Sequence, residues 1–145
     1  MTVPSSFSLP ILRNESTGYN VTLIQRLLNN AGYGSLVEDG IFGVRTDAAV
    51  KQFQKDRSLR VDGVVGPQTW KALLPPTLSR GSRGNDVERL QMTLNEMGYS
   101  LVIDGIFGPN TEAAVKGFQK NSHLEVDGIV GPLTWYALMS TMIQD

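Results

Sequence analysis

The chain has 145 residues, a formal net charge of −1, 41% hydrophobic residues and no cysteine. These values predict an ordinary globular protein, and they exclude disulfides and thiolate chemistry. The near-neutral charge argues against nucleic acid as a partner, because non-specific binding to nucleic acid depends on Lys and Arg displacing counterions. No apolar run approaches the roughly 20 residues that cross a bilayer, so we expect no membrane insertion.

The first ten residues predict an extended lead-in rather than a secretory signal. They contain no basic residue, and Pro4 and Pro10 interrupt the apolar positions. A signal peptide needs a basic start followed by an apolar core. We therefore expect residues 1–11 to be extended. If the protein works outside the cytoplasm, we expect that it leaves by another route or that this chain is a trimmed piece of a longer one.

An internal repeat organises the rest of the sequence. Residues 39–73 recur as residues 104–138, and the two copies are identical at 24 of 35 positions. Each copy also contains a smaller repeat, in which Asp-Gly is followed by two apolar residues, Gly, two further residues and Thr. This smaller repeat occupies residues 39–46 and 62–69 of the first copy. Such self-similarity indicates two tandem units of the same fold.

The first predicted helix of each unit precedes this repeat. In residues 20–31, Val21, Ile24 and Leu28 are spaced as on one face of a helix. Asn20, or Asp86 in the second unit, is a suitable N-cap. Gly32 and Gly98 follow the two helices, where a left-handed residue commonly ends a helix.

Two further helices are predicted in each unit. The second begins after the first Asp-Gly turn, at Val44 or Pro109, and proline is favoured at a first helical position. The third is short and carries a tryptophan, Trp70 or Trp135. Val65 and its neighbours are β-branched, so a short extended pairing with residues 36–37 is also expected.

These elements predict an all-α protein made of two tandem three-helix bundles joined by a short, Pro-rich linker. We assign residues 1–11 to the lead-in, 12–74 to the first unit, 75–77 to the linker, 78–139 to the second unit and 140–145 to a tail. Pro75 and Pro76 end the third helix of the first unit.

The sequence offers no catalytic or metal site. A catalytic zinc ion usually takes three protein ligands, mostly His or Cys, and this chain has one histidine, His123. A serine nucleophile would need a partnering histidine in each unit. The four Asp-Gly aspartates are explained by their turns, which leaves two-carboxylate chemistry unsupported. We therefore predict no enzymatic activity, metal or cofactor.

Polar residues that are identical in both units are the candidates for ligand binding. A glutamine, an asparagine and a tyrosine recur four residues apart along the first helix, which places them in one slanted row beside the buried stripe. Amides beside an aromatic ring suit an N-acetylated sugar or a short peptide. The alternative to ligand contact is a structural role, in which the amides satisfy backbone groups of the turns and the tyrosine packs over the helix end. The residues are Gln25, Asn29 and Tyr33, with Gln91, Asn95 and Tyr99.

Two further pairs of positions complete the prediction. Arg45 and the corresponding Asn110 are candidates for contact with a carboxylate, with an exposed and solvated position as the alternative. The tryptophans are spaced as core anchors, and the phenylalanines Phe42 and Phe107 as core plugs.

The sequence resembles the peptidoglycan-binding domain family, a small three-helix cell-wall module found beside catalytic domains in bacterial and phage wall hydrolases. The resemblance covers nearly everything between residues 12 and 139, although the opening of the first unit departs from the Gly-Ser-x-Gly form at residues 81–84. It rests on residues 87–91, 97–99, 104–109, 113–119 and 126–135, and on the matching stretches of the first unit from Leu27 onward.

This resemblance implies non-catalytic attachment to peptidoglycan, through the glycan or the stem peptide. It implies a wall-targeting or adaptor unit, or the wall-binding part of a larger hydrolase, located in the cell wall, periplasm or extracellular space. A wall hydrolase or another envelope protein is the implied partner. The alternative is a protein-interaction or structural module in which the same fold docks a protein partner.

Overall fold

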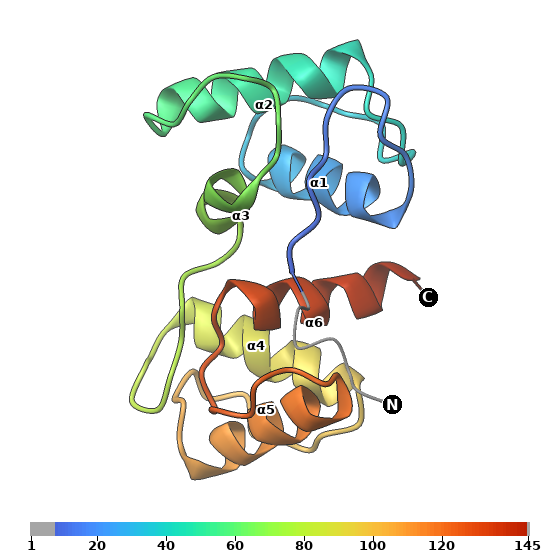
Figure 1. The fold of residues 1–145 in the computed structure, drawn as a ribbon. Coiled ribbons are helices and arrows are strands. Elements are labelled where there is room, and N and C mark those ends of the chain that lie inside the picture. Colours follow the sequence, from blue (N-terminus) through green and yellow to red (C-terminus); the bar gives the residue numbers. More distant parts are fainter. Residues whose placement is uncertain (1–7, 145) are drawn as a thin grey trace. The chain divides into compact units, whose positions relative to one another are not determined.

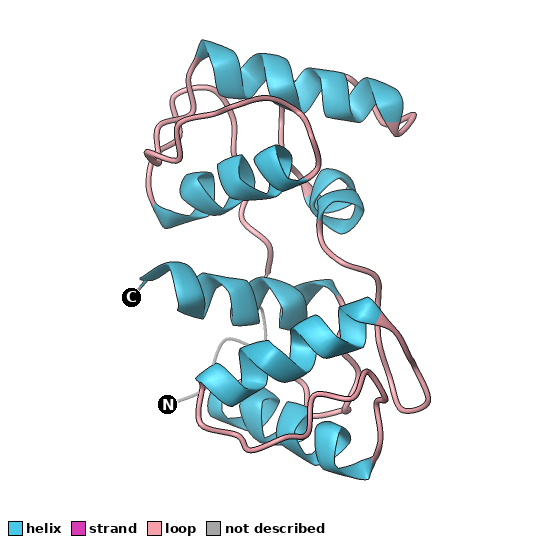
Figure 2. Cartoon of the chain, turned by 180° about the vertical axis from the view of Figure 1, so that it is seen from behind, coloured by secondary structure: helices cyan, strands magenta, loops and turns pink. Residues whose placement is uncertain are grey.

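The computed structural model describes residues 8–144, with side chains up to residue 141. The described residues form six helices and no strand (Figures 1 and 2). The helices are α1 (Tyr19–Asn30), α2 (Val44–Asp56), α3 (Pro67–Leu73), α4 (Asn85–Glu96), α5 (Pro109–Asn121) and α6 (Pro132–Gln144). The predicted all-α tandem of three-helix bundles is confirmed.

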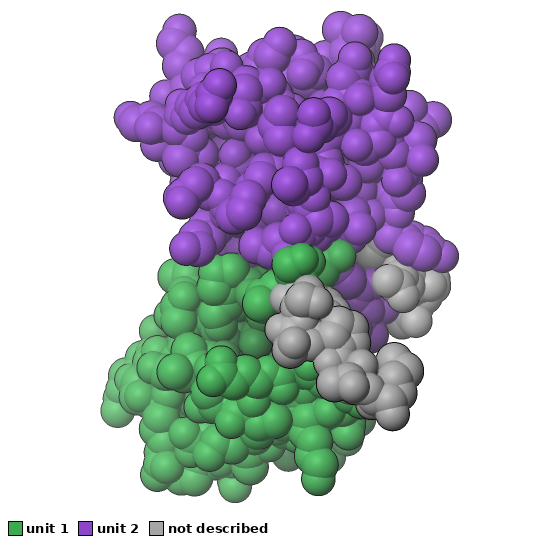
Figure 3. Space-filling view, viewed as in Figure 1, with its two compact units in different colours: residues 1–8, 75–138 green, residues 9–74, 139–145 purple. Residues whose placement is uncertain are grey.

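The described residues divide into two compact units (Figure 3). One consists of residues 9–74 together with residues 139–144, and the other of residues 75–138 together with residue 8. We call residues 9–74 the N-terminal module and residues 75–138 the C-terminal module. Helices α1 and α2 pack together in the first, and α4 and α5 in the second.

The first helix of each module starts at a glycine and not at the predicted side-chain caps. α1 follows Gly18, with φ 114°, and α4 follows Gly84, with φ 117°, and neither start has a side-chain cap. The predicted caps Asn20 and Asp86 are therefore wrong. The Gly18 N–H instead donates to the Gly40 carbonyl at 2.9 Å, so contact with the Asp-Gly turn determines where the helix begins.

The opening loops have the same conformation despite their different sequences. A serine hydroxyl closes each loop by accepting a hydrogen bond from the N–H three residues earlier, at 3.0 Å for both Ser16 and Ser82. The left-handed position is Gly81 (φ 97°) in the C-terminal module but Glu15 (φ 82°) in the N-terminal module. Most side chains are disfavoured in this region, so the N-terminal module carries local strain that the C-terminal module avoids.

Large aromatic side chains fill the core of each module, as predicted. Trp70 is 0% exposed, and Trp135, Phe42 and Phe107 are each 1% exposed. The indole N–H of Trp70 donates to the Pro10 carbonyl at 2.7 Å. In the C-terminal module the corresponding bond reaches the carbonyl of Pro76 at 2.9 Å.

The predicted extended pairing forms with a different partner. Val65 makes an isolated antiparallel bridge with Leu12, and Val130 makes the corresponding bridge with Leu78. In the predicted partner, residues 36–37, Leu36 is instead held against α1 by two hydrogen bonds with Asn29. Leu12, the first residue of the assigned unit, is the partner because the Trp70 indole bond to the Pro10 carbonyl brings this segment beside the start of α3.

The third helices differ in length. α3 has seven residues and ends at Leu73, because Leu74 precedes Pro75 and adopts an extended conformation, with ψ 157°. In the second unit, Met139 corresponds to Leu74 but is followed by Ser140 instead of a proline. α6 therefore continues to Gln144. The predicted short helix and tail are therefore wrong here, because residues 140–144 belong to α6. Residue 145, the last residue of the predicted tail, lies outside the described residues.

Candidate ligand-binding face

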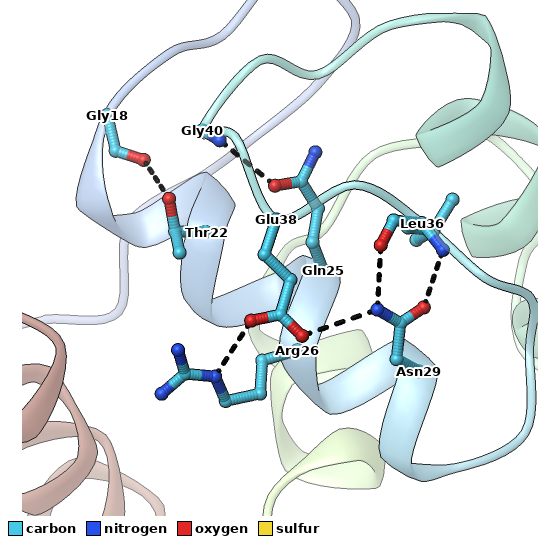
Figure 4. A network of polar contacts seen from close by, with 8 residues as sticks. All are labelled: Gly18, Thr22, Gln25, Arg26, Asn29, Leu36, Glu38 and Gly40. Atoms are coloured by element: carbon cyan, nitrogen blue, oxygen red, sulfur yellow. Dashed lines mark hydrogen bonds and ion pairs between the residues drawn. The ribbon is translucent and has the colours of Figure 1, made fainter.

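Two buried glutamines in each module brace its two Asp-Gly turns. Gln25 is 1% exposed, and its Oε1 accepts a hydrogen bond from the Gly40 N–H at 3.0 Å (Figure 4). Its Nε2 donates to the Ile41 carbonyl at 3.0 Å, to Thr46 Oγ1 at 3.1 Å and to Asp39 Oδ1 at 3.2 Å. The arrangement occurs four times: Gln25 with residues 39–46, Gln54 with 62–69, Gln91 with 104–111, and Gln119 with 127–134.

Each turn aspartate is held by the same network. Asp104 Oδ1 accepts hydrogen bonds from the Ile106 N–H at 3.0 Å and from Gln91 Nε2 at 3.1 Å. The backbone bond from Ile106 is the main cause that lowers the pKa of Asp104, followed by the bond from Gln91. The pKa of Asp39 is lowered in the same way by Ile41 and Gln25. Both carboxylates therefore stay ionised at neutral pH and act as turn acceptors.

The geometry gives Gln25 and Gln91 a structural role, which corrects their prediction as ligand contacts. Both are 1% exposed and bond only to groups of their own module. Two equivalent residues, Gln54 and Gln119, were missed by the sequence analysis. The signal was present, because both lie in an identical Phe-Gln-Lys segment eight residues before the second turn aspartate.

The two asparagines hold the loop that follows the first helix. Asn29 Oδ1 accepts from the Leu36 N–H at 2.8 Å, and its Nδ2 donates to the Leu36 carbonyl at 2.9 Å (Figure 4). Asn95 makes the same pair of bonds with Leu101, at 2.7 and 2.9 Å. Asn29 Nδ2 also reaches Glu38 at 3.3 Å. These bonds agree with the alternative role, although both asparagines remain half-buried and border the surface.

The tyrosines differ in their surroundings. Tyr33 donates its hydroxyl to Asp56 at 2.8 Å, and its ring packs edge-on against Phe53 with centroids 5.3 Å apart. The hydrogen bond to Asp56 is the first cause that raises the pKa of Tyr33. Tyr99 lies against Gly117, where a Cβ would be 3.3 Å from its ring and hydroxyl. A side chain at position 117 would crowd Tyr99, so glycine suits this contact.

Arg45 and Asn110 are both exposed, and Asn110 borders a pocket. This pocket of about 290 Å³ lies beside the first Asp-Gly turn of the C-terminal module. Another, of about 400 Å³, lies beside the second turn of the N-terminal module and includes Arg60 and Gln68. Each pocket contains one bracing glutamine, its aspartate and the Gly-Pro segment of the turn.

The described residues contain no group of three or more His, Cys, Asp or Glu side chains able to hold a metal ion. His123 lies exposed in the loop between α5 and α6, at a left-handed position with φ 62°. The site chemistry within residues 8–144 is therefore that of exposed amides, carboxylates and apolar rims.

The two copies match one protein family. Residues 17–73 and residues 83–138 each match the family described as "Putative peptidoglycan binding domain". The chain belongs to this peptidoglycan-binding domain family. The matched stretches enclose the bracing glutamines, the asparagines and the Asp-Gly turns of both modules, so the recurring network described above is the framework of a peptidoglycan-binding domain.

Similar proteins include cell-wall hydrolases. The N-acetylmuramoyl-L-alanine amidase CwlM of Mycobacterium tuberculosis is 37% identical over 110 aligned positions, covering 68% of this chain and 27% of that protein. The amidase CwlL of Bacillus licheniformis is 30% identical over 154 aligned residues, covering 83% of this chain and 43% of that protein. Among solved structures, the SleB N-terminal domain is 38% identical, with a TM-score of 0.44, over 45% of this chain and 90% of that one.

The present sequence thus spans less than half the length of these two amidases. It consists mainly of peptidoglycan-binding domains like those of wall hydrolases, and neither of its matched domains is catalytic. In the described part of the chain, no helix is both long and apolar enough to span a bilayer.

Proposed function

We propose that the protein binds bacterial cell-wall peptidoglycan through both modules, without catalysis, as a wall-targeting or adaptor unit. The observation that carries this proposal is the completeness of both copies. All four Asp-Gly turns keep their glutamine brace, and both cores keep their buried tryptophan. Each module therefore has an intact framework on which to display a binding surface.

Duplication strengthens attachment to a repetitive polymer. When one module binds, the covalent link keeps the other at a high local concentration near further sites on the same wall. This effect multiplies binding by roughly a hundredfold or more when both modules can engage. Two weak sites on one chain then bind the wall more tightly than either site alone.

The proposed contacts are the polar residues at the surface around the first helix and turn. Gln25 and Gln91 are excluded because they are buried. The remaining candidates are Asn29, Tyr33 and Arg45 in the N-terminal module, and Asn95, Tyr99 and Asn110 in the C-terminal module. Either the glycan or the stem peptide supplies the ligand, and a wall hydrolase or another envelope protein is the proposed partner, in the wall, periplasm or extracellular space.

Co-sedimentation of the full chain with purified sacculi tests the proposal. We expect retention at moderate salt, and no clearing of a wall suspension by the protein alone. Absence of retention at any salt concentration would contradict wall binding and favour the docking of a protein partner. Lysis that is lost in Asp39→Asn or Asp104→Asn would contradict the non-catalytic assignment.

A further inference from the structure

The pocket beside the first Asp-Gly turn of the C-terminal module combines apolar and polar walls. Val102, Ile106 and Pro109 supply apolar surface, and two of them are largely open to solvent, at 76% exposed for Val102 and 41% for Ile106. The volume of about 290 Å³ lies just below the range of about 300 to 1,000 Å³ for ligand pockets. A small functional group fits this space better than an entire sugar or a folded peptide.

The carboxylate of Asp104 offers one unused acceptor at this pocket. Both hydrogen bonds that it accepts, from Ile106 and Gln91, end on Oδ1. Among the residues whose side chains the structure describes, 8–141, none donates a hydrogen bond to its Oδ2. The turn holds the side chain in place, so this second oxygen is positioned in advance to receive a donor from a ligand.

Asn110 supplies the complementary group. Its side chain is exposed, lines the same pocket and makes no hydrogen bond within the described chain. An asparagine amide can donate through Nδ2 to a ligand carbonyl. The pocket thus offers an ionised acceptor, an amide donor and an apolar wall.

We propose that this pocket binds a secondary amide that carries a methyl group. Oδ2 of Asp104 accepts the N–H of the ligand, Nδ2 of Asn110 donates to its carbonyl, and the methyl packs against Val102, Ile106 and Pro109. The inference rests on the proposed wall binding and specifies its chemistry. Peptidoglycan contains this group both in the N-acetyl substituents of the sugars and in the alanyl residues of the stem peptide.

An amide fits these walls better than an ammonium group does. A cation would pair with Asp104 but would leave Asn110 without a carbonyl partner and would lose hydration against the apolar wall. A neutral amide uses both polar groups and covers apolar surface. A chitooligosaccharide in N-acetylated and deacetylated forms separates these two possibilities, because the sugar backbone is the same and the acetamido group is replaced by an ammonium.

The test titrates the full chain with defined probes and follows its backbone and side-chain amide signals by NMR. The probes are N-acetylated chitotriose, its deacetylated form, and a short peptide containing L-alanyl and D-alanyl amides. We expect shifts at Gly105 and at the side-chain NH₂ of Asn110 with an amide-bearing probe. Binding of chitotriose alone would identify the glycan as the source, and binding of the peptide alone would identify the stem.

Two variants test the assigned roles. Asp104→Asn keeps an Oδ1 acceptor for the turn but replaces Oδ2 with a donor, so we expect about a tenfold or greater loss of affinity. Asn110→Ala removes a side chain that makes no internal hydrogen bond, and we expect a loss of about fivefold. The matched control is Asp127→Asn, which makes the same exchange at the second turn of the same module and is expected to retain affinity.

The outcomes separate this inference from wall binding itself. If the chain sediments with sacculi but neither Asp104→Asn nor Asn110→Ala weakens binding of the amide probes, the pocket assignment is wrong and wall binding stands. Equal or tighter binding of deacetylated chitotriose would also overturn the assignment. If the chain binds the amide probes but not sacculi, the pocket chemistry is supported and the proposed wall function fails.

Discussion

The two modules share their interior and differ at their surface. Both keep the buried glutamines, the turn aspartates and the core tryptophan. The exposed position at the second residue of the second helix is Arg45 in one module and Asn110 in the other. Identity between two copies of one fold therefore marks the hydrogen-bond framework first, and differences between the copies mark where the binding chemistry can diverge.

This comparison changes the meaning of the repeated polar residues. A polar residue that recurs in both copies was a reasonable candidate for ligand contact, yet Gln25 and Gln91 are 1% exposed and satisfied internally. The Asp-Gly turns contain backbone groups that the helices do not satisfy. A buried amide supplies both a donor and acceptor there, so selection for folding alone is enough to retain it.

The largest expected effect concerns the bracing glutamines. Gln54→Leu in the N-terminal module and Gln119→Leu in the C-terminal module should each destabilise their own module by about 3 kcal/mol or more. Each change leaves a buried glycine N–H and a turn carbonyl without partners. Residue-resolved hydrogen exchange on the full chain measures the loss in each module separately.

Gln52→Leu is the matched control for this pair. Gln52 lies on the same helix as Gln54 but is exposed, and it bonds only to Asp56. We expect its effect to stay within about 0.5 kcal/mol. If Gln54→Leu were as mild as this control, the brace would not stabilise the turn.

The asparagines come next in expected size. Asn95→Ala and Asn29→Ala should each cost about 1 to 2 kcal/mol, because the N–H and carbonyl of one loop residue both lose a partner. Chemical denaturation measures this change, and sacculus sedimentation of the same variants measures binding. A loss of wall binding larger than the loss of stability explains would support the proposed contact between the asparagines and the ligand.

The sequence was sufficient to predict the repeat, the helical class and the aromatic cores. Periodicity and glycine placement carry this information locally, and Trp70 and Phe42 are buried as their spacing predicts. The length of α6 was also available from the sequence, since Ser140 replaces the proline that ends α3.

The starts of α1 and α4 and the role of the glutamines were not predictable in this way. Gly18 replaces Asn20 as the helix start because its N–H bonds to Gly40, which is 22 residues away in sequence. The brace likewise joins Gln25 to Thr46 across 21 residues. Such choices depend on tertiary contacts, which local propensity does not contain.

A smaller effect is expected at the left-handed position of the opening loop. Glu15→Gly should stabilise the N-terminal module by about 0.5 to 1 kcal/mol, because glycine adopts φ 82° without the cost that glutamate pays. Part of this gain is offset by the greater freedom of glycine in the unfolded chain. Gly81→Glu should destabilise the C-terminal module by a similar amount, and hydrogen exchange reports both changes. Stabilisation by Glu15→Gly together with destabilisation by Gly81→Glu would confirm that the positive φ is the cause. Destabilisation by both changes would show that the Glu15 side chain stabilises its loop.

The smallest effect concerns an ion pair that only the N-terminal module can form. Arg26 Nε lies 3.0 Å from Glu38 Oε1, with side-chain exposures of 47% and 33% (Figure 4). The corresponding residues of the C-terminal module are Met92, which follows Gln91 as Arg26 follows Gln25, and Ile103, which precedes Asp104 as Glu38 precedes Asp39.

A double-mutant cycle with Arg26→Met and Glu38→Ile measures this pair. We expect a coupling of about 0.5 kcal/mol that decreases with added salt, because solvent screens exposed charges and ordering two long side chains has an entropic cost. The reverse exchange, Met92→Arg with Ile103→Glu, should introduce a coupling of similar size in the C-terminal module. In the C-terminal module Met92 and Ile103 cannot form an ion pair, and Asn95 holds the corresponding loop through Leu101. We therefore expect the loop of the N-terminal module not to depend on the ion pair, and a coupling well above about 1 kcal/mol would contradict this expectation.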